Sequence, residues 1–463
     1  MIHFNTWGGA RWTRRRLGAR LAATAPLAAA GAAACGAPGG QSGGPAAGQP
    51  GQAARRPAEI AFMANHSADD EPLFQEVFGQ LKTKAPEIRV QFTNVTGVNY
   101  QEKLVSLAAG GTLPDTYYGR PKDTPPLVQK GMVRALDDFL RRDAREVNVQ
   151  DWWPSQMGEL QFKTRTYHTP YDYSNYGIYY NKTLFDQAGV PYPPPDWAWE
   201  QFLDTAKRLA RRQGAQPIFG LANLPGDWGL DGWLQAGGGG YFNEARDKCV
   251  MTSAPNVAVI QFLADLRLVH GVVPKPGELP PGNAFQNGWA AMEIQGSWAT
   301  LSYRNAIAEK FPWDVQALPK AKGGKRPVLA TGGAWVMAPA TKAPEAAWEV
   351  LKHVSSKDGI ETLISKPLRS VPGRQSAVAR WVETARASKA PPEHVQVFPD
   401  QMQGSFPNKP VVFWYDFVPI NNKYVGEAFT GARTVKEALA DLEREANEAI
   451  AKYEPGWLQR DRP

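Results

Sequence analysis

Residues 58–119 switch between two hydrophobic periods, and this switching constrains the fold more than any other feature of the sequence. Ile60 and Phe62 recur at the two-residue spacing of a strand, and Phe74, Val77 and Phe78 recur at helical spacing. The same alternation predicts a strand at 58–65, a helix ending near Pro86, a strand at 87–92, a helix at 100–111 and a strand at 115–119. A β-α-β-α-β order is the start of an open sheet, so we expect the α/β fold class.

Two turns of this predicted sheet are candidates for ligand contact. In open α/β sheets ligands collect at the carboxyl ends of strands. The first such turn holds Asn65, His66 and Ser67, and the second runs over 118–123. We expect both turns to face a cleft.

The length and charge of the chain narrow the possibilities further. A chain of 463 residues exceeds the roughly 250 to 300 residues at which single cores stop growing, so two lobes are expected. The formal net charge is +7, but five arginines and no lysine or acidic residue lie in residues 1–34, which leaves +2 for the rest. That balance gives no reason to expect nucleic-acid binding.

The first 34 residues are typical of an export signal. A charged start up to Arg20 precedes the apolar stretch 21–34, which is shorter than the ~20 residues that a membrane-spanning helix needs. TRRRLG, with Arg14 and Arg15 as the pair, resembles the twin-arginine export motif. An ordinary basic signal for general secretion is the alternative.

Cys35 follows this stretch and is the candidate attachment point of a lipid. The small residues before it resemble a bacterial lipobox, although Ala32 stands where leucine is common. Residues 35–57, mostly small and polar, are then expected to form a flexible linker, which suits a tether. The alternative is a soluble cut near an A-x-A site. If Cys35 is acylated, Cys249 has no disulfide partner within the chain.

Five segments carry a resemblance to a known family. They are YYNKTLFDQAGVPYPPPDWAWEQF at 179–202, LPDTYYG at 113–119, QNGWAAMEIQGSWA at 286–299, KAPEAAWEVLKHV at 342–354 and GARTVKEALADLEREANEAI at 431–450. Together they resemble the extracellular solute-binding proteins of bacterial ABC sugar importers, the maltodextrin-binding-protein-like family. The resemblance implies a two-lobed periplasmic-binding-protein fold, with two open α/β sheets joined by a hinge and a ligand cleft between them.

The family architecture implies lobes made from separate stretches of chain. Residues 58–168 plus about 324–374 would form the N-terminal lobe, and 169–323 plus about 375–463 the C-terminal lobe. The implied function is capture of a mono- or oligosaccharide by a monomer that is lipid-anchored outside the cytoplasmic membrane and delivers its ligand to the permease subunits. No catalysis, cofactor, metal or nucleic acid is implied, and the membrane is reached only through the anchor.

A sugar site needs aromatic faces against the C–H faces of the rings and polar groups for the hydroxyls. His66 could instead cap a helix or be solvated, Tyr118 could pack within its strand, and Trp298 could belong to the core. Arg120, Lys122 and Arg369 together would suit a uronic acid. By position in the family, the candidate ligand-binding residues are Asn65, His66, Ser67, Tyr118, Arg120, Asp172, Tyr173, Ser174, Asp227, Trp228, Trp298, Trp335, Arg369 and Trp414.

Two other classes of function stay open. A secreted glycosidase or lyase would need two carboxylates flanking a bond, and no pattern in the sequence fixes such a pair. A binding protein for a non-sugar solute would share the fold. A metal site is not indicated, because the six histidines stand at positions 3, 66, 168, 270, 353 and 394, none at zinc-ligand spacing.

Overall fold

The structure is a computed structural model that describes residues 57–96, 99–211, 216–366, 368–406 and 410–458. The predicted export signal, Cys35 and nearly all of the linker lie outside these residues. Pro57–Pro463 forms one compact unit. Among the described helices, none has the length and apolar content needed to cross a bilayer.

The first sheet has five strands in the order β2-β1-β3-β11-β6. β1 runs parallel to both β2 and β3, whereas β11 runs antiparallel to β3 and β6. β11 therefore enters the middle of a sheet whose other strands come much earlier in the chain. The strands are β1 (Ala58–Ala64), β2 (Ile88–Asn94), β3 (Thr116–Gly119), β6 (His168–Pro170) and β11 (Ala334–Met337).

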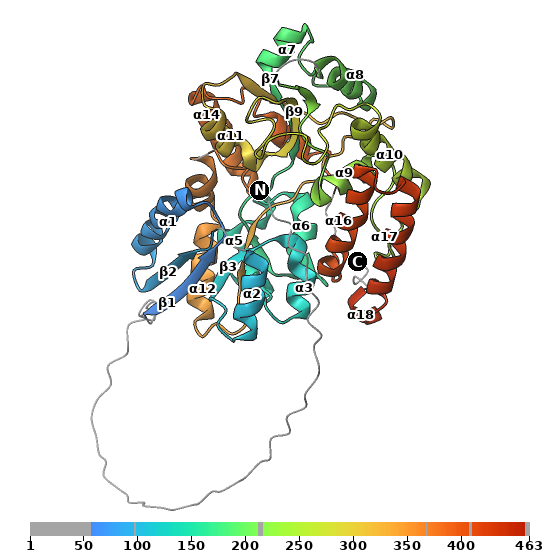
Figure 1. Ribbon diagram of the computed structural model, residues 1–463. Coiled ribbons are helices and arrows are strands. Elements are labelled where there is room, and N and C mark those ends of the chain that lie inside the picture. Colours follow the sequence, from blue (N-terminus) through green and yellow to red (C-terminus); the bar gives the residue numbers. More distant parts are fainter. Residues whose placement is uncertain (1–56, 97–98, 212–215, 367, 407–409, 459–463) are drawn as a thin grey trace, which may run out of the picture. The chain divides into compact units, whose positions relative to one another are not determined.

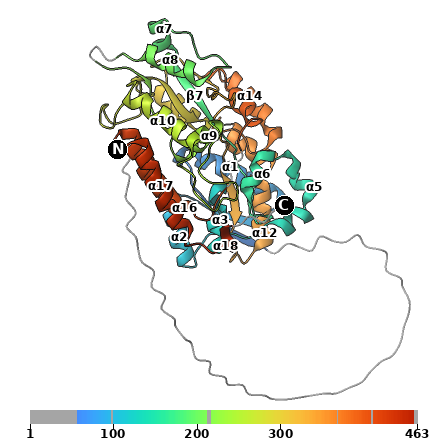
Figure 2. The same cartoon turned by 90° about the vertical axis from the view of Figure 1, so that its right-hand side faces the viewer.

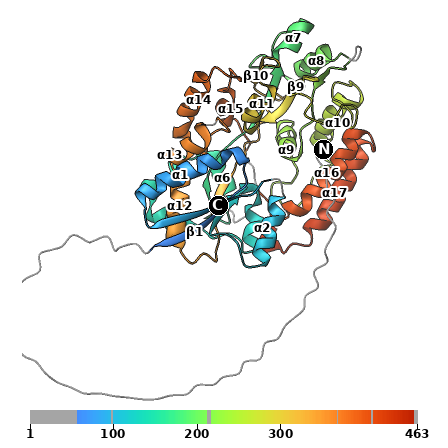
Figure 3. The same ribbon diagram turned by 60° about the vertical axis from the view of Figure 1, so that its left-hand side comes forward.

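Helices cover both faces of this first sheet (Figures 1 and 3). Alternate residues of β1 point to opposite faces: Ile60 and Phe62 join the core under α1 and α12, and Met63 joins the core under α2 and α3. We call this sheet with α1, α2, α3 and α12 the first lobe. The helices are α1 (Glu71–Lys84), α2 (Tyr100–Ala109), α3 (Thr124–Gln129), α4 (Asp137–Arg142), α5 (Ala144–Val147), α6 (Pro154–Leu160), α12 (Pro344–Val354) and α13 (Lys357–Ile360), with short turns η1 (Ala68–Asp70), η2 (Pro121–Asp123), η3 (Val149–Asp151) and η5 (Glu361–Ser365).

The second sheet has four strands in the order β10-β7-β9-β8. Its strands are β7 (Tyr176–Asn181), β8 (Phe219–Leu221), β9 (Ala290–Gly296) and β10 (Trp313–Gln316), and a small hairpin pairs β4 (Gln161–Phe162) with β5 (Arg165–Thr166). We call this four-stranded sheet with α7 to α10, α16 and α17 the second lobe. The remaining elements are α7 (Lys182–Ala188), α8 (Trp199–Leu209), α9 (Asp227–Ala236), α10 (Ala254–Leu268), η4 (Ser297–Ala299), α11 (Thr300–Ile307), η6 (Gln375–Ala377), α14 (Val378–Ala387), α15 (Val397–Met402), α16 (Trp414–Thr430), α17 (Val435–Ile450) and α18 (Pro455–Leu458).

The strands and helices predicted over 58–119 are confirmed, with ends that differ by a few residues. A capping box opens the last long helix: Thr434 accepts from the Glu437 amide, and Glu437 accepts from the Thr434 amide. α17 ends at Ile450, and Pro455 starts α18, because proline fits the first turn of a helix.

Three chain segments run side by side where the two lobes join. The segment after β6 lies in the middle: its Ser174 exchanges backbone hydrogen bonds with Thr331, at 2.7 and 2.8 Å, and the Tyr173 amide donates to Val371 O at 2.9 Å. The hydroxyl groups of Ser174 and Ser370 add a 2.6 Å hydrogen bond. We call the segments 170–175, 328–333 and 370–374 the crossing segments. Their mutual hydrogen bonds make them a small ribbon rather than three independent linkers.

The C-terminal helices contact both lobes. α16 and α17 pack on each other and on α10, and Figure 2 shows them lying along one side of the molecule. Trp457 of α18 stacks on Phe162 of the β4-β5 hairpin, with ring centroids 6.4 Å apart and planes at 5°. Lys163 lies over the Trp457 ring at 4.7 Å. The end of the described chain is therefore packed against the first lobe.

Candidate functional site

An aromatic cluster lies under the turn that follows β1. The His66 ring is buried and lies 4.9 to 5.8 Å, between centroids, from Phe74, Tyr118, Tyr171 and Trp335. Burial, with help from the charge of Arg369, lowers the pKa of His66 well below its usual value, so the ring is neutral at neutral pH. Among the described residues, its Nε2 atom has no hydrogen-bond partner.

The rest of this first turn is held by its own polar groups. The Asn65 side chain donates to Val95 O at 2.8 Å, and the His66 amide donates to Asn94 Oδ1 at 3.0 Å. The Ser67 amide donates to Asp70 Oδ2 at 3.1 Å, while the Ser67 side chain is exposed. His66 therefore neither caps α1 nor lies in solvent, because its ring belongs to the aromatic cluster.

Ion pairs line the carboxyl edge of the first sheet. Arg369 contacts Asp70, which ends the turn after β1. Arg120 Nε donates to Asp123 Oδ2 at 2.8 Å in the turn after β3. Lys122 is only 4% exposed, and its ammonium lies 5.3 Å from the centroid of the Trp414 ring, on the second lobe. Each of the three cations that the sequence suggested for a ligand is already engaged by a protein group.

Residues 172–174 lie in the middle crossing segment and are largely used by the fold. Asp172 accepts a hydrogen bond from the Gly333 amide, and burial raises its pKa. Tyr173 has no exposed surface, so its ring offers no face to a ligand in this conformation, contrary to its choice as a candidate ligand-binding residue. Ser174 is 1% exposed, and its hydroxyl is bonded to Ser370. The physical reason is that segments on both sides cover this middle segment.

Two adjacent glycines allow the crossing segments to approach the cluster. A Cβ atom at Gly332 would lie 2.0 Å from Asp172 O, and one at Gly333 would lie 2.4 Å from the Tyr118 ring. Real Cβ atoms do not come so close, and the first of these neighbours is backbone, which cannot rotate away. The pair thus lets the crossing segment 328–333 lie directly against the segment 170–175 and against Tyr118 of β3.

Among the candidates whose side chains are described, Trp298 presents the most accessible aromatic face. It lies in η4, directly after β9, and is 38% exposed, with its ring 5.2 Å from that of Tyr176 in an edge-to-face arrangement. A buried network holds this region: Tyr303 donates to Glu293 at 2.5 Å, and Tyr179 shares a 2.9 Å hydrogen bond with Thr300. Trp298 is therefore not a core tryptophan.

The other candidate aromatic residues differ in their surroundings. Trp335 is fully buried in β11, because that strand has neighbours on both sides and helices on both faces, so a direct stacking role does not fit its position. Trp414 is partly exposed at the first position of α16, above Lys122. Asp227 and Trp228 begin α9, but their side chains fall outside the described part.

The structure thus brings together His66, Tyr118 and Trp335 in one cluster, and Arg120 approaches the start of α16. The sequence reasoning missed Asp70, Asp123 and Tyr415. The charges of Asp123 and Arg120 act on the Tyr415 hydroxyl, whose pKa is raised mainly by burial. A signal for Asp123 was present, because it stands three residues after Arg120 in a predicted turn, where side chains of opposite charge commonly pair.

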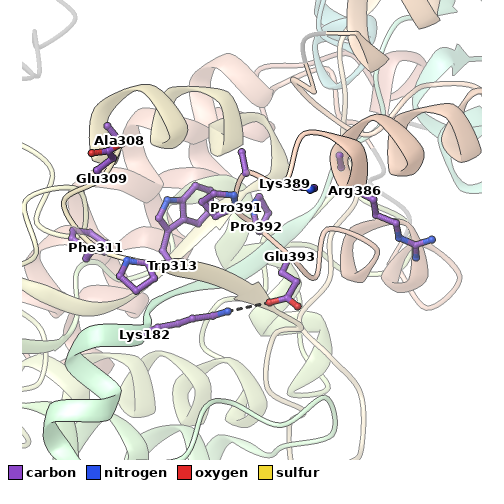
Figure 4. Close-up of a pocket in the computed structure, with 13 residues that line it drawn as sticks. Lys182, Ala308, Glu309, Phe311, Trp313, Arg386, Lys389, Pro391, Pro392 and Glu393 are labelled. Atoms are coloured by element: carbon purple, nitrogen blue, oxygen red, sulfur yellow. Dashed lines mark hydrogen bonds and ion pairs between the residues drawn. The ribbon is translucent and has the colours of Figure 1, made fainter.

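A cavity of about 580 Å³ lies elsewhere, between the start of α7 and the end of α14 (Figure 4). Next to it Asp314, Glu393 and His394 offer ligand atoms within 4.8 Å of one another, a grouping that sequence spacing did not reveal. The ammonium group of Lys182 lies 3.3 Å from Asp314 and 3.2 Å from Glu393. This lysine supplies the positive charge that a metal ion would otherwise bring.

Comparison with known proteins agrees with this architecture. The family model described as bacterial extracellular solute-binding protein matches residues 65–361. The chain belongs to this family. The fold class and the family suggested by the five sequence segments are thereby confirmed.

Individual members of the family give further comparisons. The diacetylchitobiose binding protein DasA of Streptomyces coelicolor is 25% identical over 325 residues, which cover 68% of this chain and 72% of DasA. An uncharacterized lipoprotein of Streptomyces antibioticus is 23% identical over 297 residues, covering 59% and 62%. An ABC substrate-binding protein of Listeria monocytogenes, solved in complex with cycloalternan, superposes with a TM-score of 0.77 at 21% identity, covering 85% of this chain and 99% of that one. At this identity the superposition establishes the two-lobed fold.

Proposed function

We propose that the protein binds a mono- or oligosaccharide between its two lobes and delivers it to the permease of an ABC importer. The observation that carries this proposal is the half-exposed ring of Trp298 at the carboxyl end of β9, on a chain whose turns after β1 and β3 hold the polar candidates. An exposed indole face suits the C–H face of a sugar ring. DasA and the Listeria protein, named for or solved with saccharides, support the class of ligand.

The lobe boundaries belong to the same proposal. Residues 58–168 with about 324–374 would move as one body, and 169–323 with about 375–463 as the other. The crossing segments 170–175, 328–333 and 370–374 would form the hinge. Closure around a ligand in this way is the usual hinge motion of two-lobed binding proteins.

A thermal-shift screen tests the proposal directly. A ligand that binds only the folded state raises the melting temperature. At a ligand concentration of 100 times Kd, binding adds about 2.7 kcal/mol to the free energy of unfolding. The screen covers neutral mono- and oligosaccharides, uronates, amino sugars, amino acids and peptides, followed by calorimetric titration. We expect at least one saccharide to bind without being cleaved. Binding only of a non-sugar solute would refute the saccharide proposal, and cleavage products would favour the rival glycosidase or lyase.

We further propose that Cys35 anchors the protein to the outer face of the cytoplasmic membrane. The support is the small-residue stretch before Cys35 and the linker after it, together with the lipoprotein description of the Streptomyces antibioticus relative. Cys35→Ala should move the protein from the membrane fraction to the soluble extracellular or periplasmic fraction. A matched Ser42→Ala variant in the linker should stay with the membrane. Retention of Cys35→Ala in the membrane fraction would contradict the anchor.

A further inference from the structure

The last residue of β9 is a glycine, and the ring of Trp298 lies directly on it. A Cβ atom at Gly296 would fall 2.2 Å from Cη2, 2.2 Å from Cζ3 and 2.4 Å from Cε3 of Trp298. These three atoms follow one another around the six-membered ring of the indole. A point in the plane of the ring, outside its edge, could not be about equally near to all three. The missing side chain of Gly296 therefore points at the face of the ring, and the bare backbone covers that face.

Hydrogen bonds fix the backbone on which the ring lies. The hydroxyl of the buried Tyr179 donates to Gly296 O at 3.1 Å. The Ser297 amide donates to Asn175 O at 3.0 Å, which ties the turn after β9 to the end of the crossing segment 170–175. A side chain at position 296 would therefore displace the ring of Trp298 more readily than the backbone.

Tyr176 bounds the same ring from the neighbouring strand. It stands opposite Gly296 in the ladder between β7 and β9, and its ring meets that of Trp298 edge to face. Contacts with Gly296 and Tyr176 together leave the indole little freedom to change its side-chain torsions. A ring that is ordered before the ligand arrives spares binding the entropy cost of ordering it.

We propose that Gly296 is a positioning residue for Trp298: its backbone carries one face of the indole and turns the opposite face to the ligand. This inference rests on the proposed function, because it concerns the ring that the proposal places against the saccharide. The 2.2 to 2.4 Å approach falls short of ordinary carbon–carbon contact by ~1 Å. Alanine at position 296 would thus push the ring by about that distance into the space of the sugar, or swing it away from the sugar altogether.

A double-mutant cycle measured by calorimetric titration tests this role. The probes are maltose, mannotriose and N,N′-diacetylchitobiose. For each probe that binds the wild type, Gly296→Ala should weaken binding at least tenfold, whereas adding it to Trp298→Ala should change Kd less than twofold. An equal loss in both backgrounds would overturn the positioning role, because a merely structural effect does not depend on Trp298. If Trp298→Ala itself leaves Kd unchanged, this inference fails while saccharide binding stands.

A matched control makes the same substitution elsewhere in the second lobe. Gly426 lies within α16, and a Cβ atom there would meet no atom within 4 Å beyond the backbone of its own helix. Gly426→Ala should leave Kd unchanged. Failure of all three probes and of every saccharide in the thermal-shift screen would refute the proposed function, and the contact between Gly296 and Trp298 is then decided without a ligand.

The ligand-free measurement uses 5-fluorotryptophan in place of tryptophan. The fluorine resonance of Trp298 is the one that disappears in Trp298→Ala; it should move in Gly296→Ala and stay in place in Gly426→Ala. If Gly296→Ala does not fold, adding Trp298→Ala should restore cooperative thermal unfolding by removing the collision. A resonance that does not move, or a fold lost in both backgrounds, would refute the inference.

Discussion

His168 gives the sharpest test of the electrostatics inside the first lobe. Its ring is fully buried in β6, and its Nδ1 atom lies 3.4 Å from the Thr124 hydroxyl oxygen. Burial lowers the pKa of His168 to about 3, whereas a histidine in the unfolded chain has a pKa of about 6.5. Between these values the unfolded chain binds a proton that the folded protein does not.

The sign and size of the effect follow from linkage. Stability rises with pH wherever the unfolded state binds more protons, so acidification below pH 6.5 destabilises the fold through His168. Between pH 7 and pH 5 this one group should remove about 2 kcal/mol from the free energy of unfolding. Any folded-state pKa below about 4 gives nearly the same figure over this interval, so the prediction depends only on the direction and depth of burial.

Urea unfolding of the wild type and of His168→Gln at pH 7 and pH 5 provides the measurement. Glutamine keeps a polar group of similar size but cannot take up the proton. The variant will lose stability at both pH values, yet the difference between the two pH values should shrink by about 2 kcal/mol. His66 and His353 also have lowered pKa values and remain in both proteins, so their share cancels. An equal pH difference in both proteins would show that His168 is protonated in the fold, and would refute the reasoning.

Three further predictions concern binding and stability. Trp298→Ala should weaken saccharide binding by about 30-fold. The side chain has at most ~250 Å² of surface and is 38% exposed, so a ligand can cover ~95 Å² of it, which is worth ~2 kcal/mol of binding free energy. Trp298→Phe should weaken binding less, and an unchanged Kd of Trp298→Ala in calorimetry would show that Trp298 is not part of the site. Gly332→Ala should lower the melting temperature by several degrees, because its Cβ would collide with Asp172 O, and an unshifted melting curve would contradict the close approach. Thr434→Ala should cost ~1 kcal/mol in urea unfolding through loss of the cap that binds the Glu437 amide, whereas no loss would mean that α17 does not depend on it.

Local periodicity predicted the first half of the first sheet well. The alternation of Ile60 and Phe62 and the helical spacing of Phe74 and Val77 are properties of short segments, and all of these residues are buried as expected. The resemblance to the solute-binding family then predicted the second lobe, because local periodicity alone did not predict how its strands and helices are arranged. Asp115, directly before β3, accepts hydrogen bonds from the Ala61 amide and the Thr341 hydroxyl.

The candidate site was less predictable because it depends on contacts between distant segments. Trp335 looks like any strand tryptophan until β11 is placed between β3 and β6, a pairing across more than 160 residues. Tyr173 belongs to a run of tyrosines, and the sequence does not distinguish the buried side chains of this run from the exposed ones. Arg369 pairs with Asp70, which lies some 300 positions earlier in the chain. The positive charge of Arg369 could therefore be read from the sequence, but its ion-pair partner could not.

Because β11 comes late in the sequence, its position has a consequence for the synthesis of the chain and for the behaviour of shorter fragments. Every strand of the second sheet precedes residue 317, whereas the first sheet lacks a central strand until residues 334–337 have been synthesised. Until then β3 and β6 each present an unpaired edge, to which a strand of another chain can hydrogen-bond. A fragment that stops shortly before residue 334 should therefore aggregate, and a nascent chain gains its first complete lobe only after three quarters of its length is finished.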